Sequence, residues 1–175
     1  MNEPRAFSKR LLVCAVVECL ALTVWIGGLI VIIAAVIPAV FNSLGMEPGG
    51  RFLTRVFDGY NRVVLVAMAA MGGGIAVRVR AAQAGGSAQA MPGRMEAALF
   101  GTMVLVAVLI VTVLGPQSAA LQEAAFAAKD ETARKGAYDA FFRVHNVVRS
   151  LYLVNLGLGV GLLTVKLKSW LRKDV

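Results

Sequence analysis

The sequence predicts an all-α fold, an integral membrane four-helix bundle with amphipathic or interfacial helices in its outer loops. Of its 175 residues, 58% are hydrophobic and only 16% are charged, and the mean hydropathy is +0.73. Soluble domains average nearer a quarter charged. The apolar residues also form four long blocks rather than one-sided stripes, and a spanning helix needs about 20 such residues. These observations together predict a membrane protein with four crossings.

We expect one transmembrane domain over residues 1–175, and its crossings lie near 11–40, 60–80, 96–114 and 146–167. The first apolar block runs from Leu11 to Phe41 and contains one charge, Glu18. It is about twice as long as the apolar region of a signal peptide, which spans roughly 7–15 residues. We therefore expect it to remain as a permanent helix.

The loop before the second crossing, GGRFLTRVFDGYNR, predicts an amphipathic helix. At 100° per residue, its polar side chains fall within an arc of about 60°. These side chains are Arg51, Arg55, Asp58 and Arg62. Such a helix would lie in the membrane interface or lead into the second crossing.

The loop between the third and fourth crossings, about 115–145, is too long to be structureless in a compact bundle. Its Ala-rich, charged middle predicts two helical stretches that break near Gly136. The second stretch is expected to continue into the fourth crossing. We expect this loop and the first one to lie together on the outer side of the membrane.

The distribution of basic residues favours cytoplasmic termini in the inner (plasma) membrane. Ten basic residues flank the terminal side of the crossings, against eight in the two outer loops. The net charge of +8 and pI near 10.1 would suggest nucleic acid in a soluble protein. No nucleic-acid-binding motif accompanies them, so the expected partner of the basic residues is the lipid bilayer.

Small residues predict where the helices pack against one another. In lipid, helices associate through close contact, which glycine permits. Pro38 should kink or end the first helix near the outer surface. The glycines expected at helix contacts are Gly27, Gly28, Gly72, Gly73, Gly157 and Gly161, with Gly74 and Gly159 among them.

Four short motifs together resemble a known family. They are WIGG at 25–28 followed by Pro38 and Phe41, FLTRVFDGY led by Gly50, Gly115–Pro116, and FFRVHNVVRSLYLVNLGLG at 141–159. They resemble the family called domain of unknown function 4149, which is similar to transmembrane protein 205. The resemblance covers nearly the whole chain. It implies a bacterial four-helix integral membrane protein and no particular biochemical activity.

Few residues suggest chemistry. His145 is the single histidine, so the chain alone cannot supply a bis-histidine haem or a three-ligand zinc site. His145 and Arg149 share a helical face and could mark the outer mouth of a site. Asn155 is expected to hydrogen-bond to a neighbouring helix. No nucleophile–base pair, phosphate-binding loop or paired carboxylate stands at a useful spacing. We expect no catalytic residue, no metal and no cofactor.

Glu18 is the one charge within the first apolar block, and its depth predicts its partner. It precedes Pro38 by twenty residues, or about 30 Å of helix, which is roughly the hydrocarbon thickness. Glu18 should therefore lie at the inner edge of the membrane. Arg78 and Arg80, at the end of the second crossing, reach a similar depth, so we predict that Glu18 pairs with one of them.

Three classes of function remain for a membrane protein of this kind. The first is a packing or accessory subunit that binds another membrane protein or a second copy of itself. The alternative is a small transporter or an ion- or metal-handling bundle that uses Glu18, His145 or Asn155. A cofactor-bearing redox subunit is the third, and the single histidine disfavours it. An enzyme is not expected.

Overall fold

The protein is helical throughout the residues that the computed structural model describes, 4–84 and 91–171, and no strand occurs among them. The elements are α1 (Pro4–Val31), η1 (Ile32–Val36), α2 (Ile37–Leu44), α3 (Met46–Gln83), α4 (Arg94–Leu109), η3 (Ile110–Leu114), α5 (Gly115–Ala127) and α6 (Glu131–Leu171). They form four rods that are long and apolar enough to cross a membrane: Lys9–Leu44, Met46–Gln83, Arg94–Ala127 and Glu131–Ser169. The predicted all-α membrane fold is confirmed.

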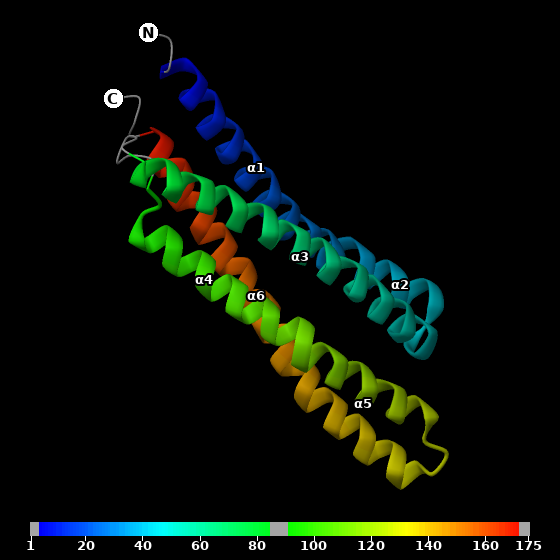
Figure 1. Cartoon of the computed structure of the whole chain (residues 1–175). Coiled ribbons are helices and arrows are strands. Elements are labelled where there is room, and N and C mark those ends of the chain that lie inside the picture. Colours follow the sequence, from blue (N-terminus) through cyan, green and yellow to red (C-terminus); the bar gives the residue numbers. More distant parts are fainter. Residues whose placement is uncertain (1–3, 85–90, 172–175) are drawn as a thin grey trace.

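The four rods form two helical hairpins (Figure 1). In the first hairpin, α1, η1 and α2 lead away from the start of α1 and form the first outward rod. The chain then turns at Gly45, whose φ of 73° favours glycine, and α3 leads back as the first returning rod. In the second, α4 to α5 run outward and α6 returns after a short turn. The start of α1, the end of α3, the start of α4 and the end of α6 lie at the same end of the molecule. We call this the terminal end, and the opposite end the far end.

Each outward rod contains one wide helical turn just before a proline. η1 precedes Pro38 and η3 precedes Pro116, and the residue before each proline donates its N–H to the carbonyl five residues back. Proline lacks an N–H, and its ring collides with the carbonyl four residues back in an α-helix. The wider π turn relieves that collision. The rods therefore continue past their prolines instead of ending there.

The helix predicted for the first loop is the beginning of α3, so it leads directly into the second crossing. The break predicted near Gly136 is wrong, because the chain turns at residues 128–130 and Gly136 lies within α6. Asp130 sets the start of α6, since its Oδ2 accepts a hydrogen bond from the N–H of Ala133 at 2.8 Å. An exposed glycine inside a helix costs only about 1 kcal/mol relative to alanine. Gly136 alone therefore does not end the helix.

The first and third loops lie together at the far end, and their predicted proximity is confirmed. Arg51 Nη1 donates to Glu123 Oε2 at 2.6 Å, which joins α3 to α5. Gln122 Nε2 donates to Thr54 Oγ1 at 3.3 Å in the same interface. A Cβ placed on Gly50 would lie 3.1 Å from the ring of Phe126, so the helices are in close contact there.

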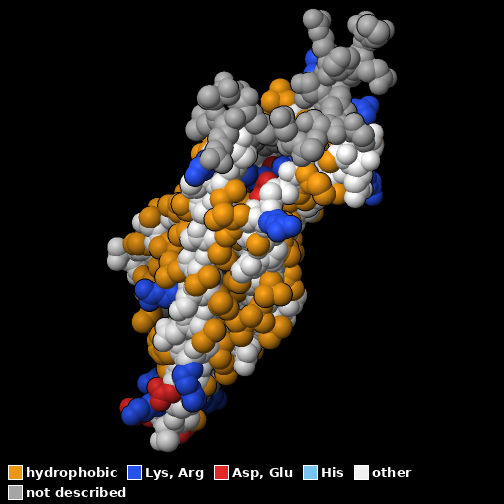
Figure 2. Space-filling view, turned by 90° about the vertical axis from the view of Figure 1, so that its left-hand side faces the viewer, with side chains coloured by type: hydrophobic (Ala, Val, Ile, Leu, Met, Phe, Trp, Pro, Cys, Tyr) orange, Lys and Arg blue, Asp and Glu red, His pale blue; other side chains and the backbone are white. Residues whose placement is uncertain are grey.

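Each rod contributes at least one fully buried apolar side chain to the main core cluster. These are Leu22, Met71, Met103 and Leu162. Trp25 and Tyr60 belong to the same cluster, and the Tyr60 hydroxyl donates to the carbonyl of Trp25 at 2.9 Å. Figure 2 shows hydrophobic side chains over much of the surface above a charged tip at the far end. An apolar outside of this kind is what a lipid environment requires.

The glycines that pack against other helices are only partly the predicted ones. A Cβ on Gly28 would lie 3.2 Å from the Tyr60 ring, so this contact is confirmed. On α3 and α6 the contacts are made by Gly74 and Gly159, where a Cβ would meet Glu18 or Ile26 at 2.6–2.8 Å. The other predicted glycines have no such neighbour within 4 Å: Gly27, Gly72, Gly73, Gly157 and Gly161. The spacing of a motif does not reveal which face of the helix turns inward.

The difference between Gly159 and Gly157 can be measured. Gly159→Ala should lower the thermal unfolding midpoint in mild detergent, because its Cβ would lie 2.8 Å from the buried Ile26 side chain; overpacking costs about 1–3 kcal/mol. Gly157→Ala should leave the midpoint unchanged or raise it, since alanine favours helix and the site is open. Equal midpoints for the two variants would contradict this packing.

Candidate functional site

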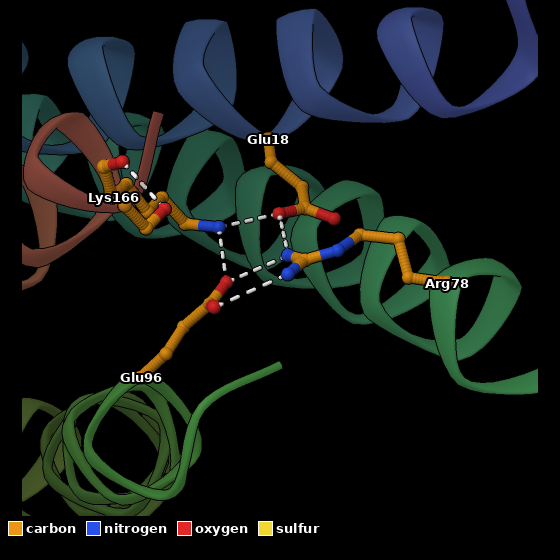
Figure 3. A network of polar contacts seen from close by, with 5 residues as sticks. Glu18, Arg78, Glu96 and Lys166 are labelled. Carbon is orange, nitrogen blue, oxygen red and sulfur yellow. Dashed lines mark hydrogen bonds and ion pairs between the residues drawn. The ribbon is translucent and has the colours of Figure 1, made fainter. Parts of the chain in front are cut away.

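Four charged side chains meet inside the bundle near the terminal end (Figure 3). They are Glu18 of α1, Arg78 of α3, Glu96 of α4 and Lys166 of α6. Each rod contributes one residue, and Figure 3 shows all four pointing toward one another. We call this group the four-charge cluster. It is the largest group of bonded charges in the described part of the chain.

The four-charge cluster is a closed ring in which each cation contacts both carboxylates. Arg78 Nη1 donates to Glu18 Oε2 at 2.9 Å and to Glu96 Oε1 at 2.7 Å, and Nη2 donates to Glu96 Oε2 at 3.2 Å. Lys166 Nζ donates to Glu96 Oε1 at 2.6 Å and also to Glu18 Oε2. The predicted pair of Glu18 with Arg78 is confirmed. Arg80, the other predicted partner, is exposed and outside the cluster.

The cluster is almost completely shielded from solvent. The side chains of Glu18 and Lys166 are 1% and 3% exposed, and that of Arg78, the most exposed of the four, is 15% exposed. Gly74 makes room for Glu18, because a Cβ there would lie 2.6 Å from Glu18 Oε1. Oε1 itself is buried and accepts no hydrogen bond from a described residue. The fit around Glu18 is therefore tight.

The four-charge cluster lies at the terminal end of the buried apolar core. On α1 and α4, no described apolar residue before Glu18 or Glu96 is buried. On α3, no described apolar residue after Arg78 is buried. The buried apolar side chains thus all lie on the far-end side of the cluster. The ring closes the terminal end of the apolar core.

Electrostatic attraction within the cluster holds the four rods together. Two carboxylates and two cations cancel in charge, and burial strengthens their mutual attraction. The same burial makes an unmatched charge costly, so loss of one member destabilises by about 3–5 kcal/mol. The two carboxylates of the cluster stand 78 residues apart in the sequence, so their spacing did not reveal the pair. Glu18 and Glu96 are brought together by the fold, and both are already bonded to Arg78 and Lys166.

A second polar group lies in the middle of the bundle. Asn155 Nδ2 donates to the carbonyl of Met103 at 3.4 Å, which confirms its predicted bond to a neighbouring helix. The Tyr152 hydroxyl donates to Asn61 Oδ1 at 2.9 Å. Asn155 and Asn61 line a cavity of about 10 Å³, which is about the space that one water molecule needs. Leu22 and Met71, which lie about one and two helical turns along their helices from Glu18 and Arg78, are fully buried.

His145 and Arg149, the two residues predicted to mark the outer mouth of a site, lie on α6. Both side chains are exposed on α6, toward the far end and away from the four-charge cluster. His145 lies against the Phe141 ring, with 5.0 Å between ring centroids. Among the described residues, no group of three or more His, Cys, Asp or Glu side chains is arranged to hold a metal ion.

Sequence reasoning missed Glu96 and Lys166, although a signal for Glu96 was present. Glu18 precedes Pro38 by twenty residues, and Glu96 precedes Pro116 by twenty. Each outward rod thus has a glutamate, a π turn and a proline in the same order. The two outward rods follow one pattern, offset by 78 residues.

The returning rods repeat a pattern as well, with an offset of 88 residues. Arg78 of α3 corresponds to Lys166 of α6 at this offset. Five of the seven buried positions of α3 correspond to buried positions of α6, among them Ala67 with Asn155, Met71 with Gly159 and Gly74 with Leu162. Each hairpin therefore supplies one acidic and one basic residue to the cluster from equivalent positions.

Comparison with known proteins assigns the chain to a family. The sequence model of the family described as "Domain of unknown function (DUF4149)" matches residues 20–127, which is more than half of the chain. The chain belongs to this family. The DUF4149 match includes Arg78 and Glu96, both π turns and both prolines, whereas Glu18 and Lys166 lie outside it. No curated protein and no solved structure matches the chain.

In this DUF4149 protein, loss of one cluster member should be costly and the losses should not add. Glu18→Gln alone should lower stability by about 3–5 kcal/mol, because it leaves a surplus positive charge in the core. The double variant Glu18→Gln/Lys166→Met restores neutrality and should lose less than the sum of its two single variants. Thermal or denaturant unfolding in mild detergent measures the three values.

The exposed pair of Arg51 and Glu123 provides the control. Their side chains are 45% and 55% exposed, and exposed ion pairs contribute only about 0.2–1 kcal/mol. Glu123→Gln should therefore have a small effect under the same conditions. Strictly additive losses for Glu18 and Lys166, or an equal effect of Glu123→Gln, would contradict the ring.

Proposed function

We propose that this protein is a non-catalytic membrane subunit that binds another membrane-spanning protein. The proposal is supported by pairs of small residues on the outer faces of the returning rods. Ala69 and Gly73 of α3 and Gly157 and Gly161 of α6 are four residues apart. Small residues at this spacing let a second helix approach closely in lipid.

These small residues do not serve the internal packing of the bundle. No other helix lies within 4 Å of a Cβ placed on Gly73, Gly157 or Gly161, and Ala69 is exposed. The two pairs also stand at equivalent positions, 88 residues apart, in the two hairpins. Each hairpin therefore presents a close-approach surface to the lipid, where another protein's helix could pack.

The four-charge cluster suits a framework better than a transport site. Both of its carboxylates are held by Arg78 and Lys166. Exchange of a proton or a metal ion at Glu18 would require separating it from two cations. His145, the other ionisable residue considered for transport, lies apart from the cluster. A rigid framework with packing surfaces outside is the function that these features favour.

Cross-linking through the outer faces tests partner binding. A photoreactive residue at Val154 of α6 or Val66 of α3, exposed positions three residues before Gly157 and Ala69, should capture the same membrane protein in cells. Mass spectrometry after purification in mild detergent identifies it. The same residue at Leu105, which is 70% exposed on α4, serves as the control and should not capture it. Gly157→Ile/Gly161→Ile should abolish capture from position 154 while the fold is retained, because both glycine positions are open.

Three outcomes would count against this proposal. Capture at position 105 equal to that at 154 would show contact without a specific face. Co-purification unaffected by Gly157→Ile/Gly161→Ile would remove the role of the small residues. Recovery of a second copy of the chain and no other protein would make this face an oligomer interface instead.

We further propose that both termini are cytoplasmic, in the inner membrane. The ten-to-eight bias of basic residues supports this orientation. A reporter that is active only in the cytoplasm should function when fused after Val175, and the same reporter inserted between Ala128 and Lys129 should be inactive. Activity only of the far-end fusion would reverse the orientation.

A further inference from the structure

A groove opens between α1 and α3 at the terminal end. Its volume is about 330 Å³, and it is lined by Lys9, Arg10, Val13, Cys14 and Val77. The first four come from the start of α1, and Val77 comes from the end of α3, next to Arg78. The groove is separate from the four-charge cluster, which lies inside the bundle.

One end of the groove carries positive charge with no described counter-ion. The side chains of Lys9 and Arg10 are exposed, and no carboxylate of a described residue lies within 4.0 Å of them. Arg80 is also exposed and stands three residues after Val77, on the same side of α3. A phosphate group placed at this end would face ammonium and guanidinium donors, which form its strongest hydrogen bonds.

The rest of the groove is apolar and continues into the outer surface of α1. Val13 is 61% exposed and Val77 is 44% exposed. Beyond Val13, the exposed residues on α1 are again apolar, namely Val16, Val17 and Leu20. A ligand that fits must therefore carry an anionic group at one end and hydrocarbon at the other. A free anion would leave the apolar floor in water.

We propose that this groove is a binding site for one anionic phospholipid of the surrounding bilayer. Its phosphate lies against Lys9 and Arg10, and the upper part of an acyl chain lies along Val13, Cys14 and Val77. Basic pockets between transmembrane helices near the membrane surface are known to hold anionic headgroups. The order of charge and hydrocarbon along the groove matches the order along a phospholipid that enters from the bilayer.

Native mass spectrometry of the full chain in mild detergent tests the site. The protein is titrated with phosphatidylglycerol, and phosphatidylcholine with the same acyl chains serves as the zwitterionic comparison. The first phosphatidylglycerol should bind more tightly than the first phosphatidylcholine. Lys9→Gln/Arg10→Gln should weaken that first binding by roughly 10- to 30-fold, since each basic residue near an anionic lipid contributes about fivefold.

The far end offers a matched control, because Arg134 and Lys135 are also adjacent, basic and exposed. Arg134→Gln/Lys135→Gln removes the same charge and should leave the first binding unchanged. Val77→Trp, which fills the groove and keeps its charges, should weaken phosphatidylglycerol binding as well. The charge-conserving variant Lys9→Arg/Arg10→Lys should retain it.

Several results would overturn the site. Equal weakening by the two glutamine double variants would show general attraction to positive charge. Equal affinity for the two lipids would show an apolar groove without headgroup recognition. Displacement of the lipid by glycerol 3-phosphate at comparable concentration would show a site for a soluble anion. Tight binding retained in Val77→Trp would place the lipid elsewhere.

Discussion

A charge inside a membrane must be matched by another charge, and this constraint organises the whole bundle. Glu18, Arg78, Glu96 and Lys166 come from four different rods, so the ring forms only when all four rods are in register. Apolar contacts between helices in lipid are weakly directional, since the lipid tails are equally apolar. The ring determines the register of the rods relative to one another, because a shift of one rod by one turn would separate opposite charges by about 5 Å.

The two hairpins meet this constraint in the same way. Each contributes a glutamate twenty residues before a proline, and each returning rod contributes a cation from an equivalent position. The π turns before Pro38 and Pro116 let both outward rods extend past the core to the far end. There, the contact between α3 and α5 joins the hairpins a second time through Arg51 and Glu123. Ion pairs therefore join the hairpins near both ends of the bundle. The buried charges at the terminal end stabilise it strongly, and the exposed charges at the far end stabilise it weakly.

The contacts that hold the rods together lie inside the bundle, so the outer faces of the rods are available for other molecules. Gly73, Gly157 and Gly161 are open to the outside, whereas Gly74 and Gly159 are occupied by internal contacts. Positive charge at Lys9 and Arg10 stands beside apolar residues at the terminal end. The proposed protein partner and the proposed lipid thus use different parts of the surface, and neither requires the four-charge cluster to open.

The sequence by itself determined the all-α fold, the four crossings and the family, because long apolar blocks can satisfy their backbone in lipid only as helices. It also indicated the partnership of Glu18 with Arg78, since helix rise converts residue number into depth. The rotation of each helix about its axis was decided by the tertiary structure. Rotation brought Gly159 rather than Gly157 inward and placed Glu96 and Lys166 beside Glu18, whereas His145 was left on the surface. The physical reason is that hydropathy is nearly uniform around a membrane helix, so only contacts with the other helices distinguish one face from another.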